Sequence, residues 1–91
     1  MEGSFRVPKL VGMDAPMASY AVILEPEAEG GFSVVVPALP EAHTQGETID
    51  EALANAREVI EAVLADRRTH GDDIPPSDMG AVLARVTVAA A

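Results

Sequence analysis

Residues 48–71, TIDEALANAREVIEAVLADRRTHG, decide the fold, because they form one long amphipathic pattern with a helix signal at each end. Thr48 and Glu51 have the T-x-x-E spacing of a capping box, in which the hydroxyl accepts from the N3 amide and the carboxylate returns to the cap's own N–H. Gly71 can adopt the left-handed conformation that ends a helix. Titratable or basic groups precede it, near the last carbonyls: Arg67, Arg68 and His70. We therefore predict a single helix over residues 48–71.

The helix carries one apolar face. Eight side chains recur at the three- and four-residue spacing that aligns them on one stripe: Ile49, Ala52, Leu53, Ala56, Val59, Ile60, Val63 and Leu64. Charged side chains such as Asp50 and Glu58 fall largely outside this stripe. The stripe predicts that the helix packs against another layer of the fold.

Four short segments have β-strand character and supply that layer. Three precede the helix, at residues 19–25, 32–36 and 41–45, and one follows it at residues 82–88. The third segment is weakly apolar and is expected at an edge. These segments predict an α+β fold of order β-β-β-α-β, an antiparallel sheet with one long helix on one face.

Glycine and proline mark the connections between these segments. Gly30 and Gly31 can adopt the positive φ values of a tight hairpin between the first two strands. Pro37 and Pro40 force an extended, non-helical connection, and Gly46 releases the chain into the helix cap.

The length of 91 residues allows one domain. Glycine and proline interrupt every apolar run in residues 1–16, so we expect a peripheral N-terminal arm there and a single domain over residues 17–91. The chain has no cysteine, no secretory signal and no run of about 18 apolar residues, so we expect a cytoplasmic protein that does not enter the membrane.

The charge of the chain is strongly acidic. Residues 17–91 contain four basic and thirteen acidic side chains, which leaves a net charge of −9 on that part. Such a surface repels phosphate backbones and attracts a basic protein, so we expect no direct binding of nucleic acid. The same charge is also typical of a small protein that is simply kept soluble, and both interpretations stay open.

The sequence contains no clear catalytic constellation. Paired acids could hold the metal ions of a nuclease, but Glu25, Glu27 and Glu29 lie at a strand end and in a loop where they are solvated. His43 and His70 lie 27 positions apart, and neither has an evident nucleophile or metal-ligand partner. No glycine cluster has the spacing of a phosphate-binding loop. We predict that the chain is not an enzyme and uses no metal or other cofactor.

Residues 20–75 resemble the HicB family of antitoxins, which neutralise the small mRNA-cleaving toxin HicA. The matching elements follow one another in order and spacing: Tyr20-x-Val22 leading to Glu25, Gly30-Gly31-Phe32, Val36-Pro37-x-Leu39-Pro40, TQGETIDEA from Thr44 to Ala52, Asn55-Ala56 and Ile74-Pro75. The block from Thr44 to Ala52 after the V-P-x-L-P turn is the most distinctive.

The resemblance implies a partial ribonuclease-H-like fold without the nuclease residues, and a HicA-type toxin as partner. Partner contacts are expected from the hairpin acids and nearby positions: Glu25, Glu27, Glu29, Phe32, Leu39 and Pro40. The helix acids Glu51, Glu58 and Glu61 are equally available. The residues expected to maintain the structure are Gly31, Pro37, Gly46, Thr48 and Glu51.

The chain departs from the family pattern in two places. Ala38 and Glu41 stand where the family commonly has an acidic residue and a glycine, so the local turn is expected to differ. The chain ends in VLARVTVAAA, without the helix-turn-helix or ribbon-helix-helix with which other members bind their operator. We therefore expect a short member that binds no DNA.

Two functional hypotheses follow. The first is a HicB-like antitoxin that acts by protein–protein binding. The alternative is an orphan module of the same fold, a homo-oligomeric regulator or small-ligand binder without a toxin. A dimer or tetramer is expected in either case, because residues 32–36, FSVVV, have apolar side chains for two faces of the sheet and one helix covers only one.

Overall fold

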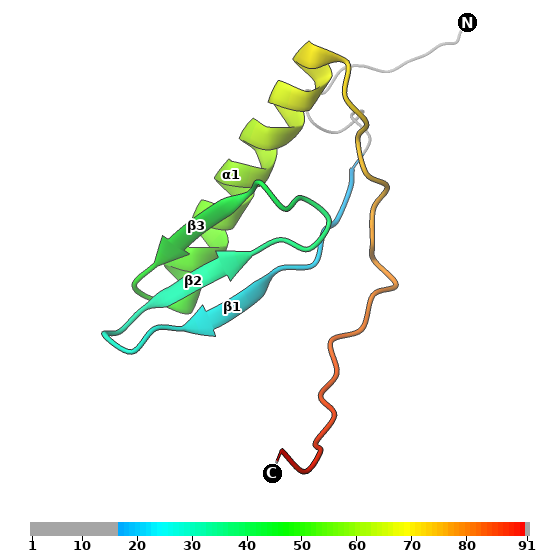
Figure 1. The fold of residues 1–91 in the computed structure, drawn as a ribbon. Coiled ribbons are helices and arrows are strands. Elements are labelled where there is room, and N and C mark those ends of the chain that lie inside the picture. The colour runs from blue at the N-terminus through cyan, green and yellow to red at the C-terminus, as the bar shows by residue number, and fades with distance from the viewer. Residues whose placement is uncertain (1–16, 91) are drawn as a thin grey trace, which may run out of the picture.

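The computed structural model describes residues 17–90, which form a three-stranded sheet with one long helix across one face (Figure 1). The strands are β1 (Ile23–Pro26), β2 (Phe32–Val35) and β3 (His43–Gly46), and the helix is α1 (Ile49–His70). The strands are antiparallel in the order β1-β2-β3, so β3 lies at an edge as expected. The predicted α+β class is confirmed, and the predicted arm at 1–16 lies outside the described residues.

The hairpin between β1 and β2 is held by its glycines. Gly30 and Gly31 have φ values of 102° and 77°, as the sequence predicts. A Cβ at Gly31 would lie 2.8 Å from the carbonyl oxygen of Gly46, so there is also no room for a side chain there. Phe32 pairs with Pro26 on one side and with Gly46 on the other. The hairpin therefore lies beside the end of β3, where the chain enters the helix.

Both predicted helix ends are confirmed. The Thr48 hydroxyl accepts a hydrogen bond of 3.1 Å from the Glu51 amide, and Gly71 ends the helix in the left-handed conformation with φ 72°. The Glu51 carboxylate differs from a standard capping box, because it accepts from the amide of Glu47 and not from that of Thr48. The carboxylate thus links the helix to the residue that precedes the cap.

The first turns of α1 lie close against the sheet. A Cβ added to Gly46 would lie 2.4 Å from the backbone nitrogen of Ala52, so only glycine fits there. Ala52 and Ala56 are the buried residues of the helix, and their small side chains allow the close approach. The helix packs mainly on β3 and β2, which leaves the β1 side of the sheet less covered.

The core is small. Its buried residues are Val34, Val36, Leu39, Ala42, Ala52 and Ala56, and further apolar side chains pack against them: Tyr20, Val22, Leu24, Phe32, Val59, Ile60, Val63 and Leu64. Two members of the predicted helix stripe are not covered, because Ile49 is 53% exposed and Leu53 is 45% exposed. The predicted stripe is therefore wider than the surface that residues 17–90 bury.

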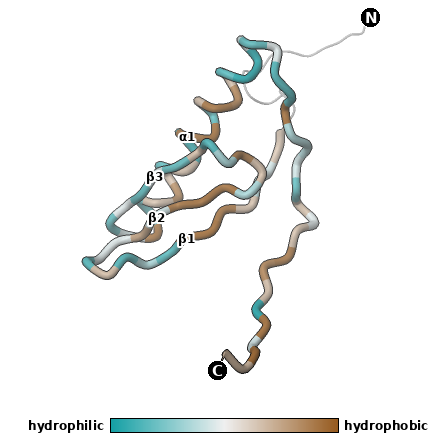
Figure 2. Tube along the Cα trace, in the orientation of Figure 1, coloured by the Kyte–Doolittle hydropathy of each residue, from teal (hydrophilic) through white to brown (hydrophobic). Residues whose placement is uncertain are grey.

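The predicted fourth strand does not form. The sequence predicts a strand at residues 82–88, but in the structure these residues extend away from the sheet without joining it (Figure 1). A strand needs a hydrogen-bonded neighbour, and this segment has none in the described part of the chain. Figure 2 shows that the segment is nevertheless largely hydrophobic. The observed order is therefore β-β-β-α.

The first strand begins later than predicted, at Ile23 instead of residue 19. The amides of Ser19 and Ala21 donate to the side chains of Ser77 (2.9 Å) and Asp78 (2.8 Å), and not to a strand. The return path after the helix is also tied down by the Tyr20 hydroxyl, which donates to the Pro75 carbonyl at 2.6 Å. Within residues 17–90, no helix combines the length and the apolar character needed to cross a bilayer.

Candidate partner-binding surface

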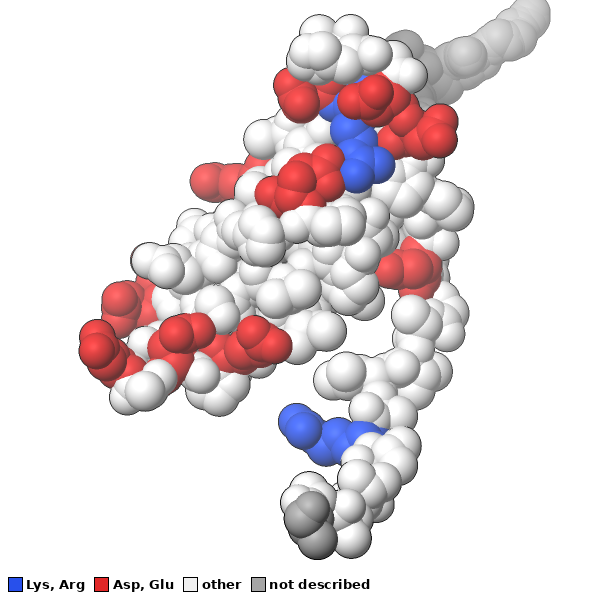
Figure 3. All heavy atoms as spheres, viewed as in Figure 1, with Lys and Arg blue, Asp and Glu red and all other residues white. Residues whose placement is uncertain are grey.

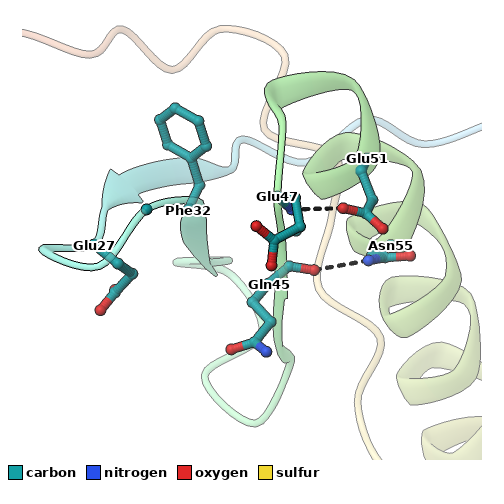
Figure 4. Close-up of a pocket in the computed structure, with 8 residues that line it drawn as sticks. Glu27, Phe32, Gln45, Glu47, Glu51 and Asn55 are labelled. Carbon is teal, nitrogen blue, oxygen red and sulfur yellow. Dashed lines mark hydrogen bonds between the residues drawn. The ribbon is translucent and has the colours of Figure 1, made fainter.

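The hairpin, the end of β3 and the start of α1 meet at one end of the sheet, around a shallow pocket of about 260 Å³. The register of β2 and β3 brings these three elements together, because Phe32 pairs with Gly46 and places residues 27–31 beside the entry to the helix. The side chains around the pocket include Glu27, Phe32, Gln45, Glu47, Glu51 and Asn55 (Figure 4). We call this region the acidic end.

Two hydrogen bonds hold the acidic end together. The Asn55 side-chain amide donates to the Gln45 carbonyl at 2.7 Å, and the Glu51 carboxylate accepts from the Glu47 amide (Figure 4). The first bond connects α1 to the end of β3, and the second connects α1 to the residue between β3 and the helix cap. The helix start and the sheet end therefore form one fixed surface, on which Phe32 remains half-exposed.

The charge of this surface is negative. The hairpin carries Glu25, Glu27 and Glu29, all exposed, and the helix entry adds Glu47, Asp50 and Glu51. Figure 3 shows carboxylates gathered over this end of the sheet. None of the arginines in residues 17–90 lines the pocket, so the carboxylates face solvent without a cation between them. Such a surface favours a basic partner.

The structure does not bring all six predicted partner-binding residues together. Glu25, Glu27, Glu29 and Phe32 lie at or near the acidic end. The prediction that Leu39 contacts a partner is wrong, because its side chain is 0% exposed and lies in the core, where it offers no surface to a partner. Pro40 is exposed but belongs to the β2–β3 connection, at the opposite end of β2 from the hairpin.

That connection is fixed to the far half of the helix by an ion pair. Arg67 donates from Nε and Nη2 to the two carboxylate oxygens of Glu41, at 2.7 and 2.8 Å, and from Nη1 to the Asp73 carbonyl. These hydrogen bonds from Arg67 lower the pKa of Glu41 to about 2. Glu41, one of the two residues of this connection that depart from the family pattern, therefore helps to fix the connection to the helix.

The sequence did not indicate every residue of the acidic end. The sequence predicts Glu51 both as part of the helix cap and as an available contact, and the structure shows it in the pocket wall. The sequence analysis does not predict Glu47 and Asn55 there, although Asn55 lies four residues after Glu51 and therefore on the same side of the helix. Glu58 and Glu61, the other helix acids, do not line the pocket.

The acidic end offers binding groups without catalytic partners. Among residues 17–90, no three histidine, aspartate or glutamate side chains are grouped so as to hold a metal ion. His43 is exposed on β3, and the Nδ1 atom of His70 lies 2.8 Å from the Asp66 carbonyl at the helix end. The arrangement can attract and hold a cationic surface.

A second hollow lies between α1 and the β1 side of the sheet. It has a volume of about 590 Å³ and is mainly apolar, with Tyr20, Val22, Leu53, Ala56, Ile60 and Leu64 among its lining residues. We call it the apolar groove. The groove shares no lining residue with the acidic end.

Comparisons with known proteins agree with the resemblance of the sequence to the HicB family. A family model described as "HicB_like antitoxin of bacterial toxin-antitoxin system" matches residues 20–87. A UPF0150 protein of Thermoplasma acidophilum is 43% identical over 56 residues, which cover 62% of this chain and 81% of that protein.

Two similar proteins are named as antitoxins. Antitoxin HicB 1 of Photorhabdus laumondii is 51% identical over 41 residues, and antitoxin HicB of Escherichia coli is 46% identical over 41 residues. Each match covers 45% of this chain but only 26% and 30% of the two antitoxins. The chain thus corresponds to most of the UPF0150 protein and to about a quarter to a third of the named antitoxins.

Proposed function

Since the chain belongs to the HicB-like antitoxin family of bacterial toxin–antitoxin systems, we propose that it neutralises a small basic HicA-type mRNA-cleaving toxin by direct protein–protein binding. The observation that carries the proposal is the family match over residues 20–87, which include all three strands and the helix. The protein would act in the cytoplasm, where mRNA is found, as a homo-oligomer and without binding nucleic acid itself.

We propose that the acidic end is the surface that meets the toxin. It combines exposed carboxylates with the half-exposed ring of Phe32 on a surface held by hydrogen bonds to the helix. An aromatic side chain surrounded by polar groups is typical of the centre of a protein interface. A protein that binds RNA needs a basic surface, and the carboxylates of the acidic end would compete with RNA for it.

Inhibition by this surface would depend on occupancy and not on chemistry. The charge would accelerate the encounter, while apolar contacts around Phe32 would retain the bound toxin. Because exposed charges are screened over a Debye length of about 8 Å at physiological ionic strength, the association rate should fall as salt rises. The dissociation rate should depend less on salt.

The experiment is co-expression of the chain with any small basic protein of about 60–90 residues that is encoded beside it, followed by stopped-flow association at several salt concentrations. Replacing Glu27, Glu29 and Glu47 by glutamine should lower the association rate and weaken its salt dependence, since all three carboxylates are exposed at the acidic end. Phe32→Ala should mainly raise the dissociation rate.

A matched control is the double variant Asp72→Asn and Asp73→Asn, which removes exposed acids just beyond the other end of α1. It should leave the association rate nearly unchanged. If the two sets of substitutions lowered the association rate equally, the interface would not be at the acidic end. Magnesium-dependent RNA cleavage by the purified chain alone, or tight binding of the chain to its promoter DNA, would contradict the proposal.

The alternative of an orphan module has one observation in its favour. The matched residues cover 81% of the UPF0150 protein of Thermoplasma acidophilum but only 26% and 30% of the two proteins that are named as antitoxins. A locus without a small basic reading frame beside this gene would favour the orphan module, and a neighbour that is toxic alone and harmless with this chain would favour the antitoxin.

A further inference from the structure

Residues 82–88, VLARVTV, are a strand in sequence but have no strand partner in residues 17–90. We call this segment the tail strand. Val82 and Val86 are each 86% exposed, Leu83 is 73% exposed and Val88 is 72% exposed. Such a run of β-branched and apolar side chains is unfavourable in water and is a template for pairing with a sheet edge.

Within residues 17–90, the sheet of the same molecule has a free edge to which a further strand could add. The outer edge of β1 pairs with no strand in the described chain, and the apolar groove lies between this side of the sheet and α1. Tyr20 and Val22, in the segment that leads into β1, line one side of the groove, and Leu53 and Ile60 line it from the helix. Leu53 belongs to the predicted helix stripe and is 45% exposed, because residues 17–90 cover only part of its side chain.

The tail strand does not fill this place in its own molecule. Residues 77 and 78 are bound beside the segment that leads into β1, where the Asp78 amide donates to the Ser19 carbonyl at 2.9 Å. The chain then turns, with the Ala81 amide donating to the Asp78 carbonyl at 2.9 Å, and the tail strand leaves the molecule (Figure 1). The preceding Pro75 and Pro76 stiffen the approach to this turn.

We propose that the tail strand of each chain adds to the β1 edge of a second copy and covers its apolar groove, so that two chains exchange tails in a symmetric dimer. Each tail keeps its base on its own molecule and places its tip on the partner. Exchange of an identical element is a low-cost route to a dimer, because the same contact forms twice.

The side-chain pattern fits this occupant. Val82, Ala84, Val86 and Val88 share one face of the tail strand and suit the apolar groove. Arg85 then lies on the other face, where β1 presents the exposed carboxylate of Glu25. Seven residues of strand span about 23 Å, enough to follow the whole of β1 at about 3.3 Å per residue.

This dimer differs from the one that the sequence suggested. The outer face of the sheet carries Ile23 and Val35, opposite each other and only half-exposed, which is a small patch for a second copy. The exchange of tail strands does not depend on the toxin proposal, and it can be tested on the purified full chain alone.

The first test is sedimentation of the full chain and its variants at micromolar concentration. The unmodified chain should sediment at about 19 kDa, twice its 9.5 kDa mass. Val86→Asp should weaken dimerisation by at least about 100-fold, because the exchange would bury an unpaired carboxylate in each groove. Helix content should stay unchanged, since Val86 is 86% exposed in the single chain. The matched control is Thr87→Asp on the opposite face, which should remain dimeric.

Mixing two variants distinguishes exchange from other dimers. Val86→Asp damages the tail and leaves the groove intact, whereas Leu53→Asp damages the groove and leaves the tail intact. Neither variant should dimerise alone. A mixture should form a mixed dimer, because one intact tail then meets one intact groove.

Three results would overturn the proposal. In the first, the wild-type chain is monomeric at micromolar concentration and its tail amides are protected from hydrogen exchange. Such protection would mean that the tail covers the groove of its own molecule. Another is a Val86→Asp chain that dimerises as tightly as the wild type. The third is a mixture of the two variants that yields only monomers.

Discussion

Replacing Leu39 by alanine should cost this small fold a large part of its stability. The side chain is 0% exposed and is the largest fully buried one in the core. Truncation of such a leucine removes its transfer free energy and leaves a cavity, at a cost of about 3–5 kcal/mol. A chain of this size has a stability of about 5–14 kcal/mol at roughly 0.05–0.15 kcal/mol per residue, so the loss ranges from about a fifth of it to all of it.

The same substitution at Leu53 is the matched comparison. Leu53 has the same chemistry and lies in the predicted helix stripe, but it is 45% exposed. About half of its apolar surface is already in water and its removal leaves no closed cavity, so Leu53→Ala should cost about 1 kcal/mol in a single chain.

The assay is urea unfolding followed by far-UV circular dichroism, which reports the 22-residue helix. Both substitutions should be made in a Val86→Asp background, so that tail exchange does not cover Leu53. With an m-value of about 1.5 kcal/mol/M, Leu39→Ala should lower the midpoint by about 2–3 M and Leu53→Ala by about 0.7 M. Equal midpoint shifts would show that the packing is assigned wrongly. In the dimeric wild-type background, the cost of Leu53→Ala should rise.

Three further predictions concern single contacts. Thr48→Ala should destabilise the chain by about 1 kcal/mol in the same urea assay through loss of the helix cap, and no change in midpoint would mean that the helix starts elsewhere. Gly46→Ala should lower the midpoint strongly, because its Cβ would lie 2.4 Å from helix backbone, while Gly80→Ala, with nothing within 4 Å, should have little effect. The lowered pKa of Glu41, about 2 against an ordinary 4.5, means that its pairing with Arg67 stabilises the fold above pH 4.5 and that this contribution is lost as pH falls from 4.5 towards 2. The stability difference between the wild type and Glu41→Gln should therefore shrink over that range, and a difference independent of pH would contradict the ion pair.

The helix could be predicted with both its ends because its signals are local. Thr48 and Gly71 act on backbone groups within one turn of themselves, so the sequence alone specifies their contacts. The capping box predicts that the Glu51 carboxylate accepts from the Thr48 amide, but it accepts from the amide of Glu47, one residue earlier. The difference arises because the path of the chain entering the helix depends on the close contact of Gly46 with the helix.

The acidic end could be predicted only in part. Glu27 and Glu29 are in a turn whose glycines and charge make it solvated in any compact fold. Leu39 lies between two prolines of an extended connection, and the sequence alone did not show that this connection folds over the core. Its burial depends on contacts between residues far apart in the chain, which no local pattern encodes.

The tail strand shows why a correct pattern can still predict a wrong contact. Alternation of apolar residues over positions 82–88 shows that the segment can be a strand, but it does not specify which chain supplies the neighbouring edge. The helix also has apolar surface beyond what its own sheet covers, because Leu53 is apolar and 45% exposed. The helix has more apolar surface than its own sheet covers, and the tail strand pairs with no sheet edge within residues 17–90 of its own chain. Both observations are explained if the tail strand of a second copy covers the exposed helix surface. Complementation between Leu53→Asp and Val86→Asp tests that link directly, since a mixed dimer forms only if the two residues belong to one contact between chains.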